Sequence, residues 1–144
     1  MWILKRLAEM GVRKEDLVMT FQSRIRTHVE QNTPLYNFAI SQKLSLLIEK
    51  VQKSCVYIML GKHATSNYSQ NLSMLNLKPL DERRMKLCNN FAKKTIKHTV
   101  HSKMFTLSKR TGTRSKPKVI IPSAKTRRYD SSSIPSLARI INKL

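Results

Sequence analysis

The acidic side chains of this sequence are its first candidates for catalysis. A two-metal nuclease or nucleotidyl transferase needs clustered carboxylates that hold divalent ions against phosphate. Neighbouring pairs occur at Glu15-Asp16 and Asp81-Glu82, while Asp130 stands alone. Both pairs fall where the first turn of a helix favours negative charge, so a helix start explains them better than a metal site does. We therefore expect no metal and no catalytic residue among the carboxylates.

Histidine, cysteine and glycine supply no other complete catalytic arrangement. His98 and His101 are three residues apart, and Cys88 is a conceivable further zinc ligand, but no second ligand pair accompanies them. We interpret both histidines as solvated residues of a basic linker. Three glycines leave no Gly-rich phosphate loop, and no nucleophile stands beside a base. The sequence predicts a protein that is not an enzyme by itself and has no cofactor.

The basic side chains indicate binding rather than catalysis. The chain has 28 Lys and Arg against 8 Asp and Glu, a net charge of +20. Residues 1–82 carry a net charge of +4, and residues 83–144 carry +16. Such an excess repels itself unless a polyanion is bound, and nucleic acid is the commonest polyanionic partner.

The candidate nucleic-acid contacts all lie in the basic half of the chain. Lys and Arg contacts to phosphate give salt-dependent, sequence-tolerant affinity, and an aromatic neighbour can stack on an unpaired base. A solvated disordered tail and a nuclear-localisation signal are the alternatives for the same segment. The candidate residues are Arg83, Arg84, Lys93, Lys94, Lys109, Arg110, Arg114, Arg127, Arg128 and Tyr129.

The elements that would position these residues are predicted to be helices. A short helix over residues 2–10 closes at Gly11, and a second begins near Lys14. Its apolar residues recur at intervals of four, which is typical of one buried helix face. They are Leu17, Phe21, Ile25 and Val29.

A longer helix is predicted between Ser41, a good N-cap, and Gly61. We expect it to be the spine of the fold, with Glu49 and Lys53 forming a favourable pair on its outer side. Its predicted buried face comprises Leu44, Leu47, Ile48, Val51, Cys55, Ile58 and Met59.

A short helix over residues 68–75 and a cationic amphipathic helix after Pro79 are predicted next. The apolar face of the second comprises Leu87, Cys88, Phe91, Ala92 and Ile96. The basic residues predicted on its exposed side are Arg83, Arg84, Lys86, Lys93, Lys94 and Lys97.

The remaining sequence divides into an irregular segment and a closing helix. The apolar residues between His98 and Ser133 follow no helical or strand-like spacing, and Ser, Thr, Lys, Arg and Pro dominate there. Ser133 as a cap and Pro135 in a first turn predict a terminal helix. The predicted fold is all-α: a small, thumb-like helical bundle (1–97), an extended basic arm (98–133) and a short terminal helix (134–144).

The two cysteines and the apolar runs bear on the cellular compartment. Cys55 and Cys88 both lie among apolar residues on helical patterns, which favours buried free thiols in a reducing compartment. The longest apolar run, CVYIML, is too short to span a membrane. We expect an intracellular protein of the cytoplasm or nucleus, with no membrane association.

Four segments together resemble a known family more specifically than composition does. They are VQKSCVYIMLGK, LNLKPLDERRMKLCNNFAKK, HSKMF and AKTRRYDSSSIPSLARIIN. In order and spacing they resemble the region downstream of the polymerase domain in non-LTR retrotransposon reverse transcriptases. The resemblance covers nearly the whole chain, which is similar to jockey-like elements.

This resemblance implies a role in holding nucleic acid without catalysis. In that family an upstream domain carries an aromatic-x-Asp-Asp motif that binds the catalytic metals, and these 144 residues contain no such motif. The chain would correspond to the thumb-like and trailing part that helps hold template RNA and primer DNA. It departs from the family pattern at Pro34-Leu35-Tyr36, where Pro is often followed by Trp, and at Thr27, where proline is usual.

The expected function is therefore that of a truncated or decayed reverse-transcriptase fragment that lacks the palm, with Met1 an internal methionine of the original frame. A free-standing basic RNA- or DNA-binding interaction protein is the alternative. An enzyme subunit completed by a partner carrying the missing polymerase domain is a third reading. The oligomeric state stays open.

Overall fold

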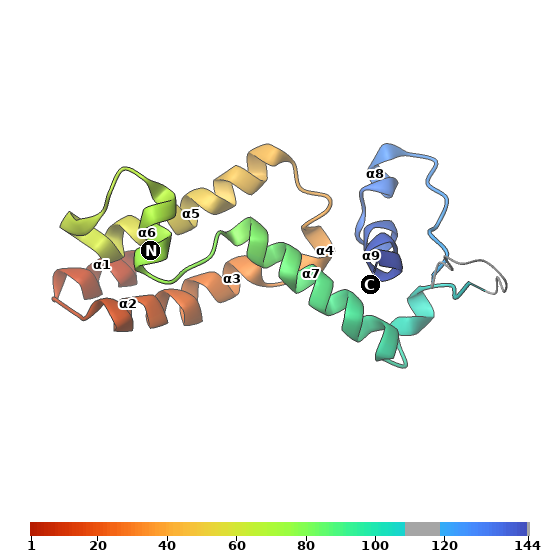
Figure 1. The fold of residues 1–144 in the computed structure, drawn as a ribbon, viewed down its shortest axis with the longest axis horizontal. Coiled ribbons are helices and arrows are strands. Elements are labelled where there is room, and N and C mark those ends of the chain that lie inside the picture. The colour runs from red at the N-terminus through yellow and green to blue at the C-terminus, as the bar shows by residue number, and fades with distance from the viewer. Residues whose placement is uncertain (109–118, 144) are drawn as a thin grey trace. The chain divides into compact units, whose positions relative to one another are not determined.

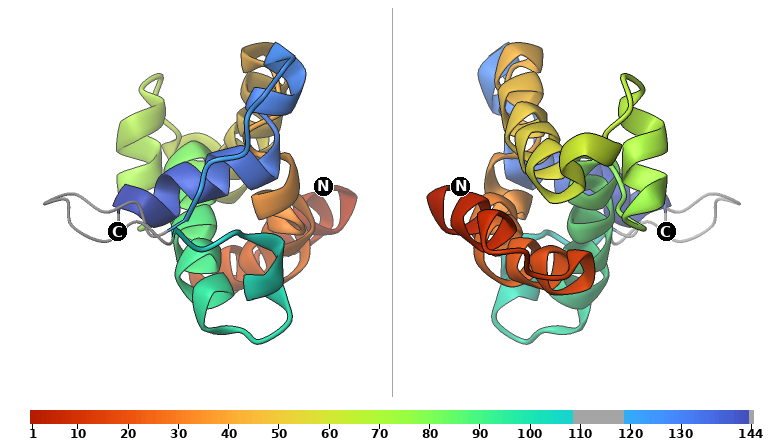
Figure 2. Two further views of the ribbon diagram at one scale, coloured as in Figure 1. Left: turned by 90° about the vertical axis from the view of Figure 1, so that its right-hand side faces the viewer. Right: turned by 90° about the vertical axis from the view of Figure 1, so that its left-hand side faces the viewer.

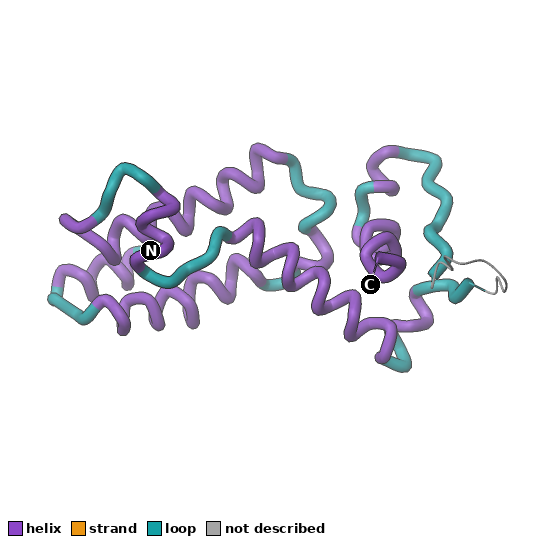
Figure 3. The backbone as a smooth tube through the Cα atoms, viewed as in Figure 1, coloured by secondary structure: helices purple, strands orange, loops and turns teal. Residues whose placement is uncertain are grey.

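The computed structural model describes residues 1–108 and 119–143, and Figure 1 traces the path of the chain. Helices joined by loops make up this described part, as Figure 3 shows, and an isolated antiparallel bridge joins Leu107 to Val119. The predicted all-α fold class is confirmed. The prediction rested on local helix signals, which do not depend on distant contacts.

The residues of the chain group into two compact units. The first unit comprises residues 1–31 and 41–83, and the second comprises residues 32–40 and 84–144. The predicted boundaries at residues 97 and 133 fall inside the second unit. They differ from the observed division because the segment predicted to be an arm contributes core residues that pack with the terminal helix.

The first unit is built on a helical hairpin whose two arms, α1 (Trp2–Glu9) and α2 (Lys14–Thr20), lie side by side (Figure 2). Gly11 turns the chain between them with a φ of +76°, a conformation that glycine adopts without strain. Leu4, Leu17 and Phe21 pack inside this hairpin against α5. The helices of the unit are α1 (Trp2–Glu9), α2 (Lys14–Thr20), α3 (Thr27–Glu30), α5 (Gln42–Leu60), α6 (Tyr68–Met74) and the first turn of α7 (Leu80–Lys97).

Helices α2 and α3 are joined by a π-helical segment, Phe21–Arg26, into one continuous rod. In an α-helix, side chains spaced by four residues drift by about 40° per step, because each residue turns about 100°. A π turn is wider and offsets that drift. The apolar residues predicted at intervals of four therefore stay on the side that faces the core. Leu17 and Phe21 are buried, and Ile25 and Val29 are half-buried.

Helix α5 has the predicted ends but only half of the predicted burial. The Ser41 hydroxyl accepts a hydrogen bond from the Leu44 backbone N–H at 3.3 Å, and Gly61 closes the helix with a φ of +51°. The C-terminal half packs into the core through Cys55, Val56, Met59 and Leu60.

The N-terminal half of the predicted apolar face of α5 is exposed, and the prediction was wrong there. Leu44 and Leu47 are 51% and 48% exposed. The apolar periodicity identifies which face of the helix can be buried. How much of that face is buried depends on the helices that pack against it.

Glu49 also lies differently from the prediction. Its carboxylate accepts hydrogen bonds from the Tyr68 hydroxyl at 2.7 Å and from the backbone N–H of Leu80 at 3.0 Å, instead of pairing with Lys53. Gln52 completes the cluster by donating to the Lys78 carbonyl at 3.0 Å. Glu49 thus satisfies a free N–H at the start of α7, where the helix dipole favours negative charge.

The core of the second unit is built around its terminal helix. Its elements are α4 (Thr33–Tyr36), the rest of α7, a 3-10 helix (His101–Met104), α8 (Arg127–Asp130) and α9 (Ser133–Lys143). The Asn142 side chain accepts from the Val119 N–H and donates to its carbonyl, both at 2.9 Å, which clamps that segment onto α9. The core residues of the unit are Ala92, Phe105, Val119, Leu137, Ala138 and Ile141.

This core corrects the prediction of an extended arm. Phe105 and Val119 are 8% and 1% exposed, so described residues of the predicted arm contribute to the core. Two short helices, His101–Met104 and Arg127–Asp130, also form within the segment predicted to be irregular. Ser133 begins α9, and its hydroxyl donates to the Leu35 carbonyl at 2.6 Å instead of capping α9. Lys109, Arg110 and Arg114 lie outside the described residues.

The buried thiols predict a labelling experiment that reports on each unit separately. Cys55 in the first unit and Cys88 in the second are both fully buried, and burial raises the pKa of each thiol. At pH 8 we expect alkylation by iodoacetamide at least about a hundredfold slower than in the guanidinium-unfolded chain. Mass spectrometry of timed aliquots measures each site, and labelling of either thiol at the unfolded rate would contradict the structure.

Candidate nucleic-acid interface

Two of the predicted phosphate contacts are engaged inside the protein. Arg83 donates through Nε and Nη2 to the two carboxylate oxygens of Glu30, the second at 3.0 Å. Arg84 is 2% exposed, and its Nε donates to Oδ1 of Asn37 at 3.1 Å. The prediction that both lie on the exposed side of α7 was wrong, because helical spacing does not reveal acidic or amide partners distant in sequence.

Glu30 sits between two guanidinium groups of the first unit. Arg83 bonds it directly, while Nε of Arg26 is 3.8 Å from the same carboxylate. The hydrogen bonds to Glu30 raise the pKa of Arg83, whereas burial and the charge of Arg83 lower the pKa of Arg26. The opposite directions follow from geometry, because only Arg83 receives the full paired contact. These charges stabilise the unit and are not available to a ligand.

Four lysines on α7 remain exposed and form a lysine stripe. Lys86, Lys93 and Lys97 follow one face at intervals of seven and four residues, and Lys94 lies beside them. The stripe runs for roughly 16 Å along the helix, at about 1.5 Å per residue. None of the four forms an ion pair with a described carboxylate.

The second unit offers the lysine stripe almost no local negative charge. Asp130 is the only Asp or Glu residue in 83–144. It bonds Arg139, whose Nη1 also donates to the Asp130 carbonyl at 3.0 Å. The stripe therefore presents positive charge to solvent with few acidic residues in its own unit, which favours contact with phosphate.

Helix α8 carries the second group of predicted contacts. The Thr126 hydroxyl accepts from the Tyr129 N–H at 3.3 Å and fixes the start of this one-turn helix. Arg127 and Arg128 are exposed, and the Tyr129 ring is 42% exposed. The geometry leaves two guanidinium groups and one aromatic ring accessible together.

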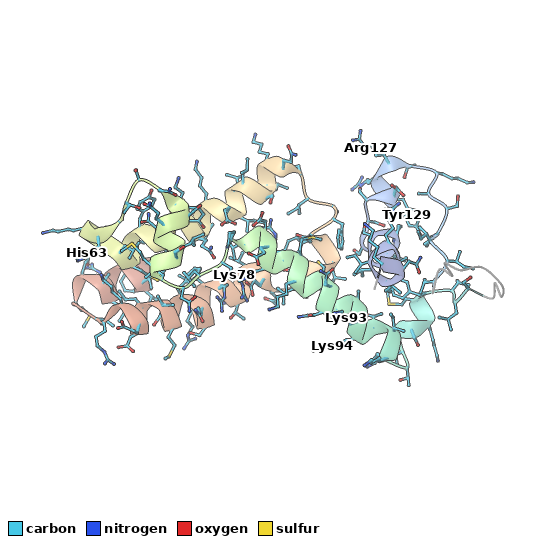
Figure 4. The ribbon with its side chains drawn as sticks, viewed as in Figure 1. His63, Lys78, Lys93, Lys94, Arg127 and Tyr129 are labelled. Carbon is cyan, nitrogen blue, oxygen red and sulfur yellow. The ribbon has the colours of Figure 1, made fainter. Side chains whose placement is uncertain are left out.

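The structure does not bring the two groups into one patch. Figure 4 shows Lys93 and Lys94 on α7, well separated from Arg127 and Tyr129 on α8. Lys86 and Lys97, which were predicted to be exposed on this helix but were not among the candidate contacts, extend the α7 group. Their seven- and four-residue spacing with Lys93 is the sequence signal that identifies them.

The residues considered for metal binding occupy structural positions. Both acidic pairs stand in the first turns of α2 and α7, as predicted. His98 and His101 are exposed with their rings stacked at 4.2 Å, and Nδ1 of His98 accepts from the backbone N–H of Val100 at 3.3 Å. Within the described residues, no group of three or more potential metal ligands is assembled.

Comparison with family models, with curated proteins and with solved structures finds no match to this chain. Among the described residues, no helix combines the length and the apolar character needed to cross a membrane. The site is therefore interpreted from its own geometry and charge.

Proposed function

We propose that this chain is a post-polymerase segment of a non-LTR retrotransposon reverse transcriptase, which binds template RNA or primer DNA and catalyses no reaction by itself. The sequence resemblance over four segments supports the family. The absence of an aromatic-x-Asp-Asp motif from these 144 residues supports the lack of catalysis.

The lysine stripe is the observation that carries the binding proposal. It combines regular spacing on an ordered helix with exposure and almost no acidic neighbours in residues 83–144. Lysine contacts with phosphate release condensed counterions and do not read base edges. The expected affinity is therefore steeply salt-dependent and tolerant of sequence.

Neutralising the stripe tests this function. We expect a variant with Lys86→Gln, Lys93→Gln and Lys97→Gln to bind a single-stranded RNA oligonucleotide more weakly at low salt. The slope of log K against log salt should become about 2 units less steep, since each lost phosphate contact contributes about 0.7. Fluorescence anisotropy over a series of salt concentrations measures both quantities.

A charge-matched variant serves as the control. Replacing Lys5, Lys14 and Lys62 of the first unit with glutamine removes the same charge from exposed sites. This control should leave the slope within about 1 unit of the unmodified chain. An equal loss of RNA affinity in both variants would contradict the assignment of RNA binding to the lysine stripe. An affinity of the unmodified chain that does not change with salt would contradict it as well.

A free-standing basic RNA- or DNA-binding protein is the second candidate. The packed core of each unit favours it, because each joins residues distant in sequence into a buried cluster. Translation of the DNA upstream of Met1 separates the two candidates. A palm-coding frame, intact or degraded, supports the reverse-transcriptase proposal, whereas an ordinary promoter and leader supports the free-standing protein.

A further inference from the structure

An apolar groove of about 600 Å³ lies along the exposed N-terminal half of α5, within the first unit. Leu46 is 70% exposed and Leu47 is 48% exposed there. Tyr68 of α6 also lines the groove. The lining residues are Gln42, Lys43, Leu46, Leu47, Glu49, Lys50, Lys53 and Tyr68.

Three lysines flank the apolar floor of the groove. Lys43 and Lys50 lie three or four residues from Leu46 and Leu47, and Lys53 lies three residues beyond Lys50 and seven beyond Leu46, which places all five on neighbouring positions of one helix face. Their aliphatic stems extend the apolar surface while their ammonium groups remain in water. The groove is thus apolar along its centre and cationic at its edge.

Hydrogen bonds hold the Tyr68 side of the groove in place. The Tyr68 hydroxyl donates to Glu49 and accepts from Nε2 of Gln52 at 3.1 Å, which fixes the ring. Nζ of Lys53 stands 5.9 Å from the centre of that ring. Glu49 itself is engaged with Tyr68 and Leu80, so its charge is directed into the protein. A rigid pocket wall lowers the entropic cost of binding.

We propose that this groove docks an acidic amphipathic helix of a partner protein. The apolar face of such a helix covers Leu46 and Leu47, and its carboxylates meet the three lysines. The distance from Lys43 to Lys53 is roughly 15 Å, about three helical turns. Helix-in-groove binding of this length uses apolar anchors spaced by three, four and seven residues.

Charge and surface chemistry favour an acidic helix over two other occupants, a second copy of this chain and nucleic acid. A second copy of this chain carries a net charge of +20 and is repelled. Nucleic acid supplies phosphates for the lysines, but its backbone offers no apolar surface to cover Leu46 and Leu47. The proposal is independent of the function assigned to the lysine stripe, which lies in the second unit.

Synthetic peptides test the groove in the full chain. The probe is a fluorescent three-turn peptide with leucines on one face and glutamates beside them. A second peptide has alanines in place of the leucines and keeps the charge. We expect the leucine peptide to bind at least about tenfold more tightly, since apolar anchors dominate such interfaces.

Protein variants assign that binding to the groove. Leu46→Ser together with Leu47→Ser should weaken the leucine peptide about tenfold and leave the alanine peptide unchanged. The matched control is Met19→Ser, which alters an apolar side chain of the same unit that is 67% exposed. It should leave both affinities unchanged. Circular dichroism of each variant verifies that the helices persist.

Three results would overturn the proposal. The first is equal binding of the leucine peptide to the double serine variant and the unmodified chain. The second is a self-association of the unmodified chain, measured by light scattering, that the double serine variant abolishes. The third is a loss of RNA affinity on replacing Lys43, Lys50 and Lys53 with glutamine that equals the loss in the stripe variant.

Discussion

Replacing Phe21 with alanine is expected to lower the free energy of unfolding of the first unit by about 3–5 kcal/mol. Phe21 is 1% exposed and packs at the junction of α2 and the π-helical segment. Removing the ring loses the free energy gained by burying it. It also leaves a cavity in the core that the surrounding helices close only in part. In a unit of this size the melting temperature should fall by at least about 12 °C.

Thermal and urea unfolding followed by circular dichroism measure this loss. Alkylation of Cys55 reports the first unit, and alkylation of Cys88 reports the second. Phe21→Leu keeps most of the volume and should cost less than about 1.5 kcal/mol, so it remains measurable if the alanine variant is unfolded. Met19→Ala, on the exposed side of α2, should change stability by less than about 0.5 kcal/mol. Similar losses for Phe21→Ala and Met19→Ala would contradict the packing.

Replacing Glu30 with alanine is the second large expected effect. The Glu30 side chain is 14% exposed, and its carboxylate lies between the guanidinium groups of Arg26 and Arg83. Without it, two partly buried positive charges face each other with no acidic partner between them. We expect a loss of about 2–4 kcal/mol, below the range for fully buried pairs because Arg83 is partly screened by solvent.

A second substitution checks the electrostatic cause of that loss. Combining Glu30→Ala with Arg83→Met removes one of the repelling charges and should recover part of the stability. Glu9→Ala breaks the exposed pair with Arg6 and should cost less than about 1 kcal/mol. Urea denaturation of the unmodified chain, Glu30→Ala, Arg83→Met and the double variant gives the coupling energy, and strict additivity of the two changes would contradict direct interaction.

The pH dependence of this contact follows from the direction of the arginine shift. Hydrogen bonding to Glu30 raises the pKa of Arg83 in the folded state. A raised pKa stabilises the fold at all pH values below the pKa of the unfolded chain, and this contribution is lost only as pH rises through the folded pKa. Arginine stays protonated throughout the usual range, so Arg83 adds no pH dependence to stability between about pH 5 and 9.

Helix boundaries were predictable because their signals are local. Ser41 and Gly61 both act within one turn of the ends of α5, and Gly11 ends the first helix through its own φ. The acidic pair after Pro79 marks the first turn of α7 in the same way. The all-α class followed from these signals and from the apolar period.

The candidate interface was only partly predictable, because exposure depends on distant partners. Arg84 and Lys93 have similar helical surroundings in sequence, yet Arg84 bonds Asn37 and is buried, whereas Lys93 is exposed. Phe105 and Val119 lie in an irregular basic segment with no period, and their burial depends on contact with α9 through Asn142.

The sequence by itself determined where the longer helices begin and end and that positive charge gathers in its second half, since both properties belong to residues and their near neighbours. It did not reveal the one-turn helices α4 and α8. The tertiary structure alone decided which charges are neutralised and which apolar faces are covered. Glu49 illustrates the difference: its predicted partner was Lys53, four residues away, and its observed partners are Tyr68 and Leu80. Hydrogen bonds in a partly buried site stabilise a carboxylate more than an ion pair with an exposed lysine does, because water screens the exposed pair.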